Sequence, residues 1–318
     1  MMNPTCSIVI RAFNEAKHLG KLFEGIANQT VKDIEVILVD SGSSDDTVAI
    51  AEKNDASIVH IPPQEFTFGR SLNKGIAAAN GQFILVCSAH VYPVYPDWIE
   101  KILEPFQDPE IALVYGKQRG TPQSHFSEQQ IFKHWYLEES HIPQDHPFCN
   151  NANAAIRRAL WEQRKYDEAL TGLEDLEWAQ WAFDQQHKIA YVADATVIHV
   201  HQESSKSIKN RYMREGMAFK HIYPQETFTM TDLVRLVTKN VLSDYAAAFA
   251  EKRIRNECLN ILCFRWMQFY GTYVGYRRSG QLTWNLRQSF YYPRNHVHRI
   301  ANETNRTVKP IDYTESKR

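Results

Sequence analysis

The 318-residue sequence predicts an α/β fold: a mixed, mostly parallel, Rossmann-like sheet flanked by helices, with a helical C-terminal extension. Two observations support this prediction. In the first part of the chain, short β-branched runs alternate with amphipathic helical patterns, which is the order typical of doubly wound sheets. Beyond residue 203 the strand-like runs stop, and long helical patterns rich in Arg and aromatic residues follow.

The strands and helices follow from the spacing of apolar residues. The predicted strands in the first part of the chain are 6–10, 34–39, 57–61, 83–87 and 111–115. The predicted helical patterns between them lie within 19–26, 48–53, 72–76 and 99–106. From Gly116 the sequence is less regular, and there we expect an amide-bearing strand at 148–156, a helix from Leu173, and final strands at 190–192 and 196–201.

We place a boundary near residue 203, which gives a first domain at 1–202 and a helical segment at 203–318. In that segment, the apolar faces 233–242 and 254–273 predict helices that pack on the first domain or on a second subunit in a homodimer. Trp266 and Tyr270, followed by Arg277 and Arg278, are also typical of a helix that lies on a membrane surface. We expect the tail after Val308 to be frayed.

Composition narrows the class of protein. The net charge is −1 and no basic block occurs, so we expect no nucleic-acid partner. The five scattered cysteines form no C-x-x-C pair and predict reduced thiols in a cytoplasmic protein. The sequence shows neither a basic-then-apolar leader nor an 18-residue apolar run, so we expect the protein to work in the cytoplasm, including the inner face of the membrane.

Polar residues follow the first two predicted strands, at the sheet edge where open α/β folds bind ligands. The two stretches read Ser7-Ile-Val-Ile-Arg-Ala-Phe-Asn-Glu15 and Val39-Asp-Ser-Gly-Ser-Ser-Asp-Asp-Thr47. Alone, the second is ordinary helix-capping chemistry. Together they resemble the N-terminal signature of family 2 glycosyltransferases with the GT-A fold, over about residues 4–201. The resemblance implies a catalytic domain with a donor half (about 1–115) and an acceptor half (about 116–202). It also implies that the donor nucleotide contacts Arg11, Phe13, Glu15, Asp40, Ser43 and Asp45 or Asp46.

A third stretch, Phe66-Thr-Phe-Gly-Arg-Ser-Leu-Asn73, is similar to the segment that closes over the nucleotide in this family. More narrowly, it resembles the branch that includes bacterial rhamnosyltransferases. The resemblance implies that Arg70 and Asn73 reach a phosphate or the base. The alternative is a surface Arg at an ordinary helix start.

The fourth predicted strand brings Ser88-Ala89-His90 to the same edge. The family usually has D-x-D here, whose last carboxylate binds the divalent metal, Mn or Mg, that bridges the diphosphate. Both carboxylates are replaced, so three roles stay open for His90: a metal ligand that suits Mn, Zn or Fe better than Mg, a direct diphosphate contact, or a structural residue. His199 and His201 share a strand face at i and i+2, and the family often places a His there, so the resemblance implies that His199 or His201 joins His90. The alternative is a pair of structural, hydrogen-bonded histidines.

Leu173-Glu-Asp-Leu-Glu-Trp178 resembles the family's E-D block at a helix start. The resemblance implies that Asp175 is the general base that takes the proton of the acceptor hydroxyl, with Glu174 orienting the acceptor or capping the helix. For Glu-Asp alone, complementing the helix dipole is the simpler interpretation. The acceptor contacts that we expect are Asn151, Asn153 and Trp178.

The sequence therefore predicts an inverting glycosyltransferase that moves a sugar from a nucleoside-diphosphate donor to a glycan or lipid-linked acceptor in surface polysaccharide synthesis. The main alternative is a catalytically degenerate nucleotide-sugar-binding or scaffold protein that lost D-x-D. Dehydrogenase and P-loop classes lack their glycine motifs in this sequence.

Overall fold

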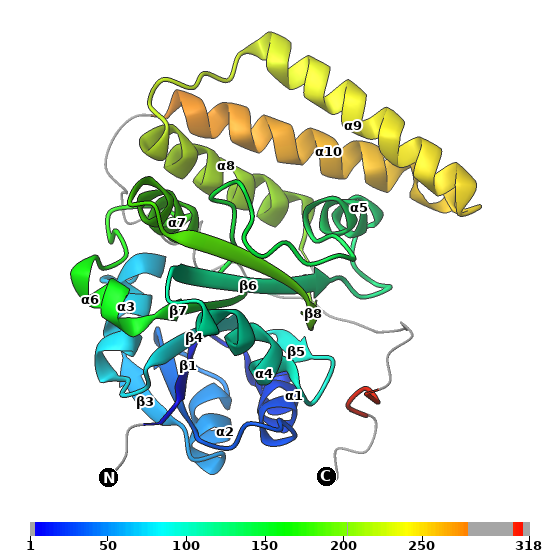
Figure 1. Ribbon diagram of the computed structural model, residues 1–318. Coiled ribbons are helices and arrows are strands. Elements are labelled where there is room, and N and C mark those ends of the chain that lie inside the picture. The colour runs from blue at the N-terminus through cyan, green and yellow to red at the C-terminus, as the bar shows by residue number, and fades with distance from the viewer. Residues whose placement is uncertain (1–3, 202, 279–307, 314–318) are drawn as a thin grey trace.

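The computed structural model describes residues 4–201, 203–278 and 308–313, and its centre is a mixed sheet with helices on both faces (Figure 1). The strand order is β3-β2-β1-β4-β7-β6-β8-β5. Four neighbours run parallel: β3 (Ser57–His60), β2 (Ile34–Asp40), β1 (Cys6–Ala12) and β4 (Phe83–Ser88). The mixed half contains β7 (Asn153–Arg157), β6 (Ile111–Arg119), β8 (Lys188–His199) and β5 (Val91–Pro93). Of these, β7 runs antiparallel to β4 and β6, and β8 runs parallel to β6. The predicted fold class is confirmed.

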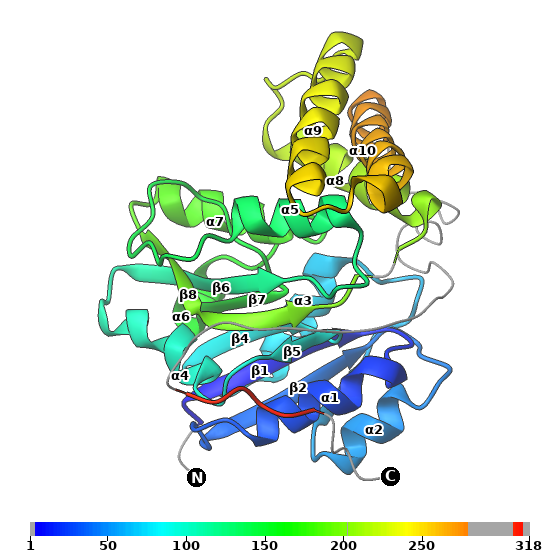
Figure 2. The same ribbon diagram turned by 90° about the vertical axis from the view of Figure 1, so that its right-hand side faces the viewer.

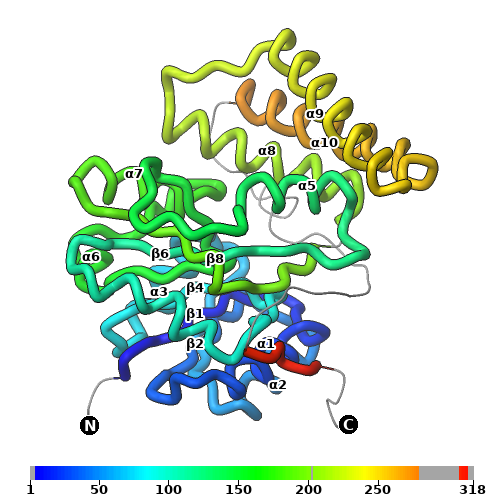
Figure 3. The backbone as a smooth tube through the Cα atoms, turned by 45° about the vertical axis from the view of Figure 1, so that its right-hand side comes forward, coloured from blue at the N-terminus to red at the C-terminus, as the bar shows by residue number. Residues whose placement is uncertain are grey.

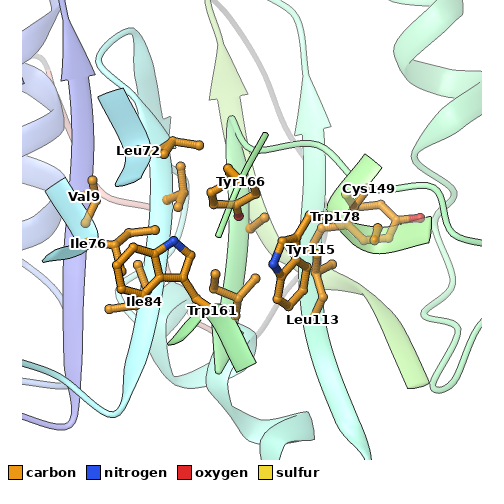
Figure 4. Close-up of a cluster of buried hydrophobic side chains, with 14 of the residues drawn as sticks. Val9, Leu72, Ile76, Ile84, Leu113, Tyr115, Cys149, Trp161, Tyr166 and Trp178 are labelled. Carbon is orange, nitrogen blue, oxygen red and sulfur yellow. The ribbon is translucent and has the colours of Figure 1, made fainter. Parts of the chain in front are cut away.

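Each face of the sheet carries its own buried core because successive strand residues point to opposite sides. On one side, Ile8 and Ile10 pack under α1 (Ala16–Ala27), α2 (Thr47–Lys53), α4 (Trp98–Leu103) and the 3-10 turn Glu104–Gln107. On the other side, Val9 packs under α3 (Phe68–Ala78), α6 (Arg158–Gln163) and α7 (Glu174–Asp184). Figure 4 shows Trp161, Tyr166 and Trp178 filling this second core.

The C-terminal helices form a layer beyond the second face: α8 (Ser205–Ile222), α9 (Met230–Ala250) and α10 (Ile254–Arg277) (Figures 1 and 2). α10 lies closely along α8, since a Cβ built on Gly275 would come within 2.3 Å of the Met213 carbonyl oxygen. Below α9 and α10 lies α5 (Phe126–Trp135), whose Phe126 joins their apolar cluster. A buried ion pair between Arg265 Nε and Asp244 Oδ2, at 2.7 Å, joins α10 to α9.

Several sequence predictions need correction. The amide-bearing strand begins at Asn153, so Asn150 and Asn151 lie in the turn before it. The two predicted final strands are one, β8, and it ends at His199, so His201 lies beyond the strand. Helix α5 and the short strand β5 were not predicted.

The segment 308–313 is held against the sheet domain, contrary to the predicted frayed tail after Val308. The last part of that tail, 314–318, lies outside the described residues. Ile311 donates its N–H to the Val94 carbonyl at 3.0 Å, and Tyr313 Oη donates to the Pro93 carbonyl at 2.6 Å. These bonds set the segment beside the end of β5, and Figure 3 shows it next to α1.

Candidate functional site

The loops after β1 and β2 are bonded to each other, which places most of the predicted nucleotide residues at one edge of the sheet. Asn14, at φ 54°, donates its backbone N–H to Ser43 Oγ at 2.9 Å, and its side-chain oxygen accepts the N–H of Ser44 at 2.8 Å. Asp45 Oδ2 accepts the N–H of Ala16 at the start of α1, at 3.1 Å. Ser43 and Asp45 therefore hold the two loops together, and their contact with a nucleotide stays a prediction.

Asp40 and Glu15 take different positions in this edge. Asp40 is 3% exposed, and its two oxygens accept the N–H groups of Gly42 at 3.1 Å and Ser43 at 3.0 Å. Its carboxylate thus shapes the turn. Phe13 is half-buried and directly follows Ala12, which pairs with Asp40 across β1 and β2. Glu15 directs its carboxylate to His90 Nδ1 at 2.8 Å, so it belongs to the histidine cluster described below.

The α3 residues predicted to reach the nucleotide contact the segment 166–168 instead. Asn73 is buried, and its amide nitrogen donates to the Tyr166 carbonyl at 2.9 Å while its oxygen accepts from Trp161 Nε1 at 3.0 Å. Its predicted nucleotide contact is wrong, because the amide is fully engaged in the core. Arg70 is about one-third exposed and pairs with Glu168 at 2.7 Å, so its nucleotide role stays a prediction.

Three histidines from distant parts of the chain converge after β4 and β8. One ring nitrogen from each of His90, His199 and His201 lies within 4.8 Å of the others. The His90 and His199 rings stack with centroids 5.2 Å apart, and the His199 and His201 centroids are 4.0 Å apart. The pairing of Val91 with His199 in the β5–β8 ladder explains this convergence, because it sets His90 next to the end of β8. The sequence prediction had grouped these three residues.

A chain of hydrogen bonds fixes the proton on His199. The Ala152 N–H donates to Asn150 Oδ1 at 3.0 Å, so that atom is an acceptor, and it also accepts from Gln118 Nε2 at 3.1 Å. Gln118 Oε1 must then accept, and it lies 2.7 Å from His199 Nδ1. The proton therefore sits on Nδ1, and Nε2 carries a lone pair. Nε2 is buried with no hydrogen-bond partner among the described residues.

Carboxylates orient the other two imidazoles in the same sense. Glu128 Oε1 accepts from His201 Nδ1 at 2.7 Å and from Arg211 Nη2 at 2.8 Å. Burial opposes the negative charge of Glu128, but His201 and Arg211 outweigh it and lower the pKa of this carboxyl to about 2. Glu15 orients His90 through Nδ1, and Ser88 Oγ lies 3.1 Å from His90 Nε2. All three rings thus turn Nε2 away from their partner carboxylate or amide.

This donor set fits a divalent metal ion. Burial lowers the pKa of His199 well below its usual value, and the neighbouring His201 and His90 act in the same direction, so its imidazole is neutral. Neutral imidazoles whose Nδ1–H is held by a carboxylate or amide are typical metal ligands. Imidazole nitrogen suits Mn, Zn or Fe better than Mg. In the described part of the chain, Glu128, His201 and Glu203 form a second such group, but Arg211 pairs with both carboxylates and competes with a metal ion for them.

The E-D block lies at the start of α7 with both carboxylates buried. Asp175 is 8% exposed, and its oxygens accept the N–H of Asn151 at 2.9 Å and of Leu176 at 2.8 Å. Burial raises the pKa of Asp175 to about 7, and the negative charge of Glu174 adds to the effect. Glu174 itself pairs with Arg11 Nη1 at 3.0 Å. Asp175 therefore has the protonation behaviour of a general base near neutral pH.

Arg11 links this block to the C-terminal helices through Phe68. The guanidinium carbons of Arg11 and of Arg214 on α8 each lie 4.5 Å from the centroid of the Phe68 ring. Thr171 Oγ1 also donates to the Arg214 carbonyl at 2.7 Å. Two cations thus meet at the Phe68 ring, and one of them, Arg11, also pairs with Glu174.

Two of the three predicted acceptor contacts are wrong. Trp178 is fully buried, and its Nε1 donates to the Arg164 carbonyl at 2.7 Å. Asn153 is also fully buried, with Oδ1 accepting from Trp98 Nε1 at 2.9 Å and Nδ2 donating to the Ala195 carbonyl at 2.8 Å. Neither side chain has a face for a sugar. Asn151 lies next to Asp175, and its Nδ2 is buried without a hydrogen-bond partner among the described residues, so its acceptor role stays a prediction.

Sequence reasoning missed the residues that support the histidines. Gln118 lies in β6, and Glu128 lies in the unpredicted helix α5. The available signal was Phe126 and Phe132 with the acidic Glu128 in the first turn, a pattern typical of a short amphipathic helix. Arg211, on α8, also supports this group, because its guanidinium pairs with Glu128 and Glu203.

Comparison with known proteins identifies the family of the chain. The model of the family "Glycosyl transferase family 2" matches residues 7–164. The chain is 27% identical to the O-antigen chain rhamnosyltransferase WbaN of Salmonella anatum over 230 residues, 67% of this chain and 72% of that protein. It is 26% identical to the O-antigen chain rhamnosyltransferase RfbN of Salmonella typhimurium over 225 residues, 66% and 71% of the two chains.

Solved structures are similar in fold. The mannosyltransferase PcManGT from Pyrobaculum calidifontis, in complex with GDP-Man and Mn2+, superposes with a TM-score of 0.59 at 16% identity, covering 86% of both chains. S. aureus TarS 1-349, in complex with UDP-GlcNAc, superposes with a TM-score of 0.53 at 15% identity, covering 98% of this chain and 99% of that one. The chain therefore belongs to glycosyl transferase family 2 and has the GT-A fold.

Proposed function

We propose that this glycosyltransferase is inverting and moves a hexosyl or deoxyhexosyl unit from a nucleoside-diphosphate donor to a hydroxyl of a glycan or lipid-linked acceptor in surface polysaccharide synthesis. The observation that carries the proposal is Asp175 at the start of α7, whose burial raises its pKa to about 7. The O-antigen rhamnosyltransferases named above support the sugar class. A GalNAc(5)-diNAcBac-PP-undecaprenol beta-1,3-glucosyltransferase of Campylobacter jejuni, 35% identical over 86 residues, 26% of this chain and 28% of that protein, supports a lipid-linked acceptor.

In the proposed reaction the acceptor hydroxyl oxygen bonds to the anomeric carbon. The bond from that carbon to the diphosphate oxygen breaks on the opposite face, and the electron pair leaves with the diphosphate. The hydroxyl proton passes to Asp175. A base whose pKa is close to the working pH combines a deprotonated population with adequate proton affinity. The N–H groups of Asn151 and Leu176 hold the carboxylate in one orientation during this transfer.

His90, His199 and His201 would hold the divalent metal. When bound, such an ion supplies positive charge for the diphosphate as it leaves. The imidazole donors favour Mn over Mg in this position, where the usual D-x-D would favour either. Glu15 and Glu128 fix the ring orientations, and Gln118 fixes the tautomer of His199.

The remaining sequence candidates complete the proposal. The donor side is proposed to be lined by Arg11, Phe13, Asp40, Ser43, Asp45 and Arg70. Arg11 also pairs with Glu174, so its positive charge lies between the donor side and the E-D block. Asn151 is proposed on the acceptor side because its backbone N–H donates to the base and its Nδ2 has no hydrogen-bond partner among the described residues.

A donor screen followed by product analysis tests the proposal. Thermal shifts with a panel of nucleotide sugars, with Mn or Mg, should identify a donor that stabilises the protein. NMR of the product with that donor should show the anomeric configuration opposite to the donor's. Asp175→Asn should lower transfer about 100-fold or more while donor binding persists, and Asp184→Asn, at the other end of α7, should leave transfer unchanged. Donor binding without any transfer by the unaltered protein would instead favour the degenerate binding protein.

A further inference from the structure

The outward sides of α9 and α10 expose large apolar side chains. Leu242 and Phe249 on α9 are 62% and 75% exposed, and Leu259 on α10 is 77% exposed. Leu262 and Trp266 on α10 are each 45% exposed. The sequence pattern favoured packing of these faces on the first domain or on a second subunit, and Leu242, Leu262 and Trp266 are not covered by the described part of the chain.

These side chains form one stripe on each helix. On α9 the stripe is Arg235, Lys239, Leu242, Ala246 and Phe249, spaced i, i+4, i+7, i+11 and i+14. On α10 it is Arg255, Leu259, Leu262 and Trp266, spaced i, i+4, i+7 and i+11. Each stripe begins with cations and continues into apolar and aromatic residues. The two helices form the layer farthest from the sheet (Figures 1 and 2).

The charge of this layer differs from that of the whole chain. Residues 230–278 contain eight Lys and Arg and four Asp and Glu, a net charge of +4 in a chain whose net charge is −1. All four acidic residues are in ion pairs: Asp232 with Arg235, Asp244 with Arg265, Glu251 with Lys133, and Glu257 with Arg253. Within the described residues, Lys239, Lys252 and Arg255 have no ion pair, and all three are exposed.

We propose that α9 and α10 dock the protein on the surface of a bilayer with anionic headgroups. Apolar and aromatic side chains bordered by cations are the features of helices that lie in the membrane interface, and cations near an anionic leaflet add to the binding. A second copy of the chain would bring a like-charged face against this one, which disfavours a dimer here. No helix in the described residues is long and apolar enough to cross a membrane, so the contact is peripheral.

Docking would also orient the active site. α10 lies along α8, and Arg211 of α8 pairs with Glu128, which orients His201. A bilayer under α9 and α10 would therefore lie a fixed distance from the histidine cluster. Lipid docking goes beyond the proposed transfer reaction and does not depend on it.

Vesicle sedimentation of the full chain tests the docking. The unaltered protein should pellet with vesicles of equal phosphatidylcholine and phosphatidylglycerol, and at least tenfold less with phosphatidylcholine alone. Lys239→Gln, Lys252→Gln and Arg255→Gln together should weaken binding to the anionic vesicles, by roughly fivefold per cation. Phe249→Ser with Leu259→Ser should weaken it about tenfold or more. Leu137→Ser, a comparably exposed leucine outside both helices, should bind like the unaltered protein.

Other outcomes overturn the proposal. Equal pelleting with neutral and anionic vesicles would contradict the charge reasoning, and absence of pelleting with both would contradict docking altogether. Gel filtration tests the alternative occupant, a second copy of the chain. If the unaltered protein is a dimer and Phe249→Ser with Leu259→Ser makes it a monomer, this face is a subunit interface. Circular dichroism of each variant confirms that it is folded before its binding is compared.

Discussion

Replacing Asp175 by Asn should abolish transfer and, at alkaline pH, stabilise the folded protein. Asp175 has an ordinary pKa of 3.8, which burial and the charge of Glu174 raise to about 7. The folded state therefore binds this proton more tightly than the unfolded state does. The free energy of unfolding falls as pH rises from about 4 to about 7, and it stays at the lower level above that range.

The size of the effect follows from the same two pKa values. A carboxyl raised from 3.8 to about 7 costs roughly 4 kcal/mol of folding stability once it is fully ionised. At pH 5 only part of this cost is present, so the difference between pH 5 and pH 8 is roughly 2–3 kcal/mol. Asn carries no charge and escapes this cost. Its NH2 group would face the N–H of Asn151 or Leu176, and the lost hydrogen bond costs about 1–3 kcal/mol at every pH.

The assay is urea unfolding of the wild type and of Asp175→Asn at pH 5 and pH 8. The stability of the variant relative to the wild type should increase by roughly 2–3 kcal/mol between the two pH values, whatever its sign at pH 5. Asp184→Asn should show no such change. A relative stability of Asp175→Asn that is the same at both pH values would refute the raised pKa, and with it the assignment of Asp175 as a base working near neutrality.

Three further predictions follow from contacts in the structure. Glu128→Gln should weaken Mn binding about 10- to 100-fold, measured by calorimetry, because His201 loses the carboxylate that orients it. Asp244→Leu should lower the free energy of unfolding by about 3–5 kcal/mol in urea titrations, because Arg265 is left buried and unpaired. Trp178→Phe should lower stability by removing the hydrogen bond to the Arg164 carbonyl, and it should leave the KM for the acceptor unchanged because Trp178 is fully buried.

Each of these has its own control. Glu139→Gln, an exposed carboxylate outside the cluster, should keep Mn affinity, and equal loss in both variants would show that orientation of His201 is irrelevant. Replacing Asp244 and Arg265 together by Leu and Met should cost less than Asp244→Leu alone. A raised acceptor KM for Trp178→Phe with unchanged stability would restore the acceptor role that its burial contradicts.

The sequence was sufficient for the parallel strands β1 to β4 because each of them is a short apolar run. Ile8 and Ile10 alternate with Val9, and the structure puts them in different cores. The same reasoning was insufficient at 148–156, where Asn150 and Asn151 precede the strand. Periodicity does not distinguish an amide that caps a turn from one on a strand, since both are polar residues next to an apolar run.

At the site, it was harder to predict whether a side chain faces a ligand or the core. Asn73, Asn153 and Trp178 are polar or amphipathic residues at positions near a predicted ligand, and all three are satisfied inside the core. A buried polar group needs a partner somewhere in the fold, and sequence spacing does not identify that partner. The histidines were predicted because the resemblance grouped them, whereas Gln118 and Glu128 had no such guide.

The predicted boundary near residue 203 marks a change of secondary structure, but the histidine cluster extends across it. His201 is oriented by Glu128 before the boundary, and Glu128 is held by Arg211 after it, at 2.8 Å. Arg214, also after the boundary, lies over Phe68 beside Arg11. A chain ending at 202 would lose the cation that pairs with Glu128, a carboxylate that is 2% exposed in the full chain. The helices therefore complete the second layer of contacts around the histidines, and the proposed metal site would depend on them for its geometry.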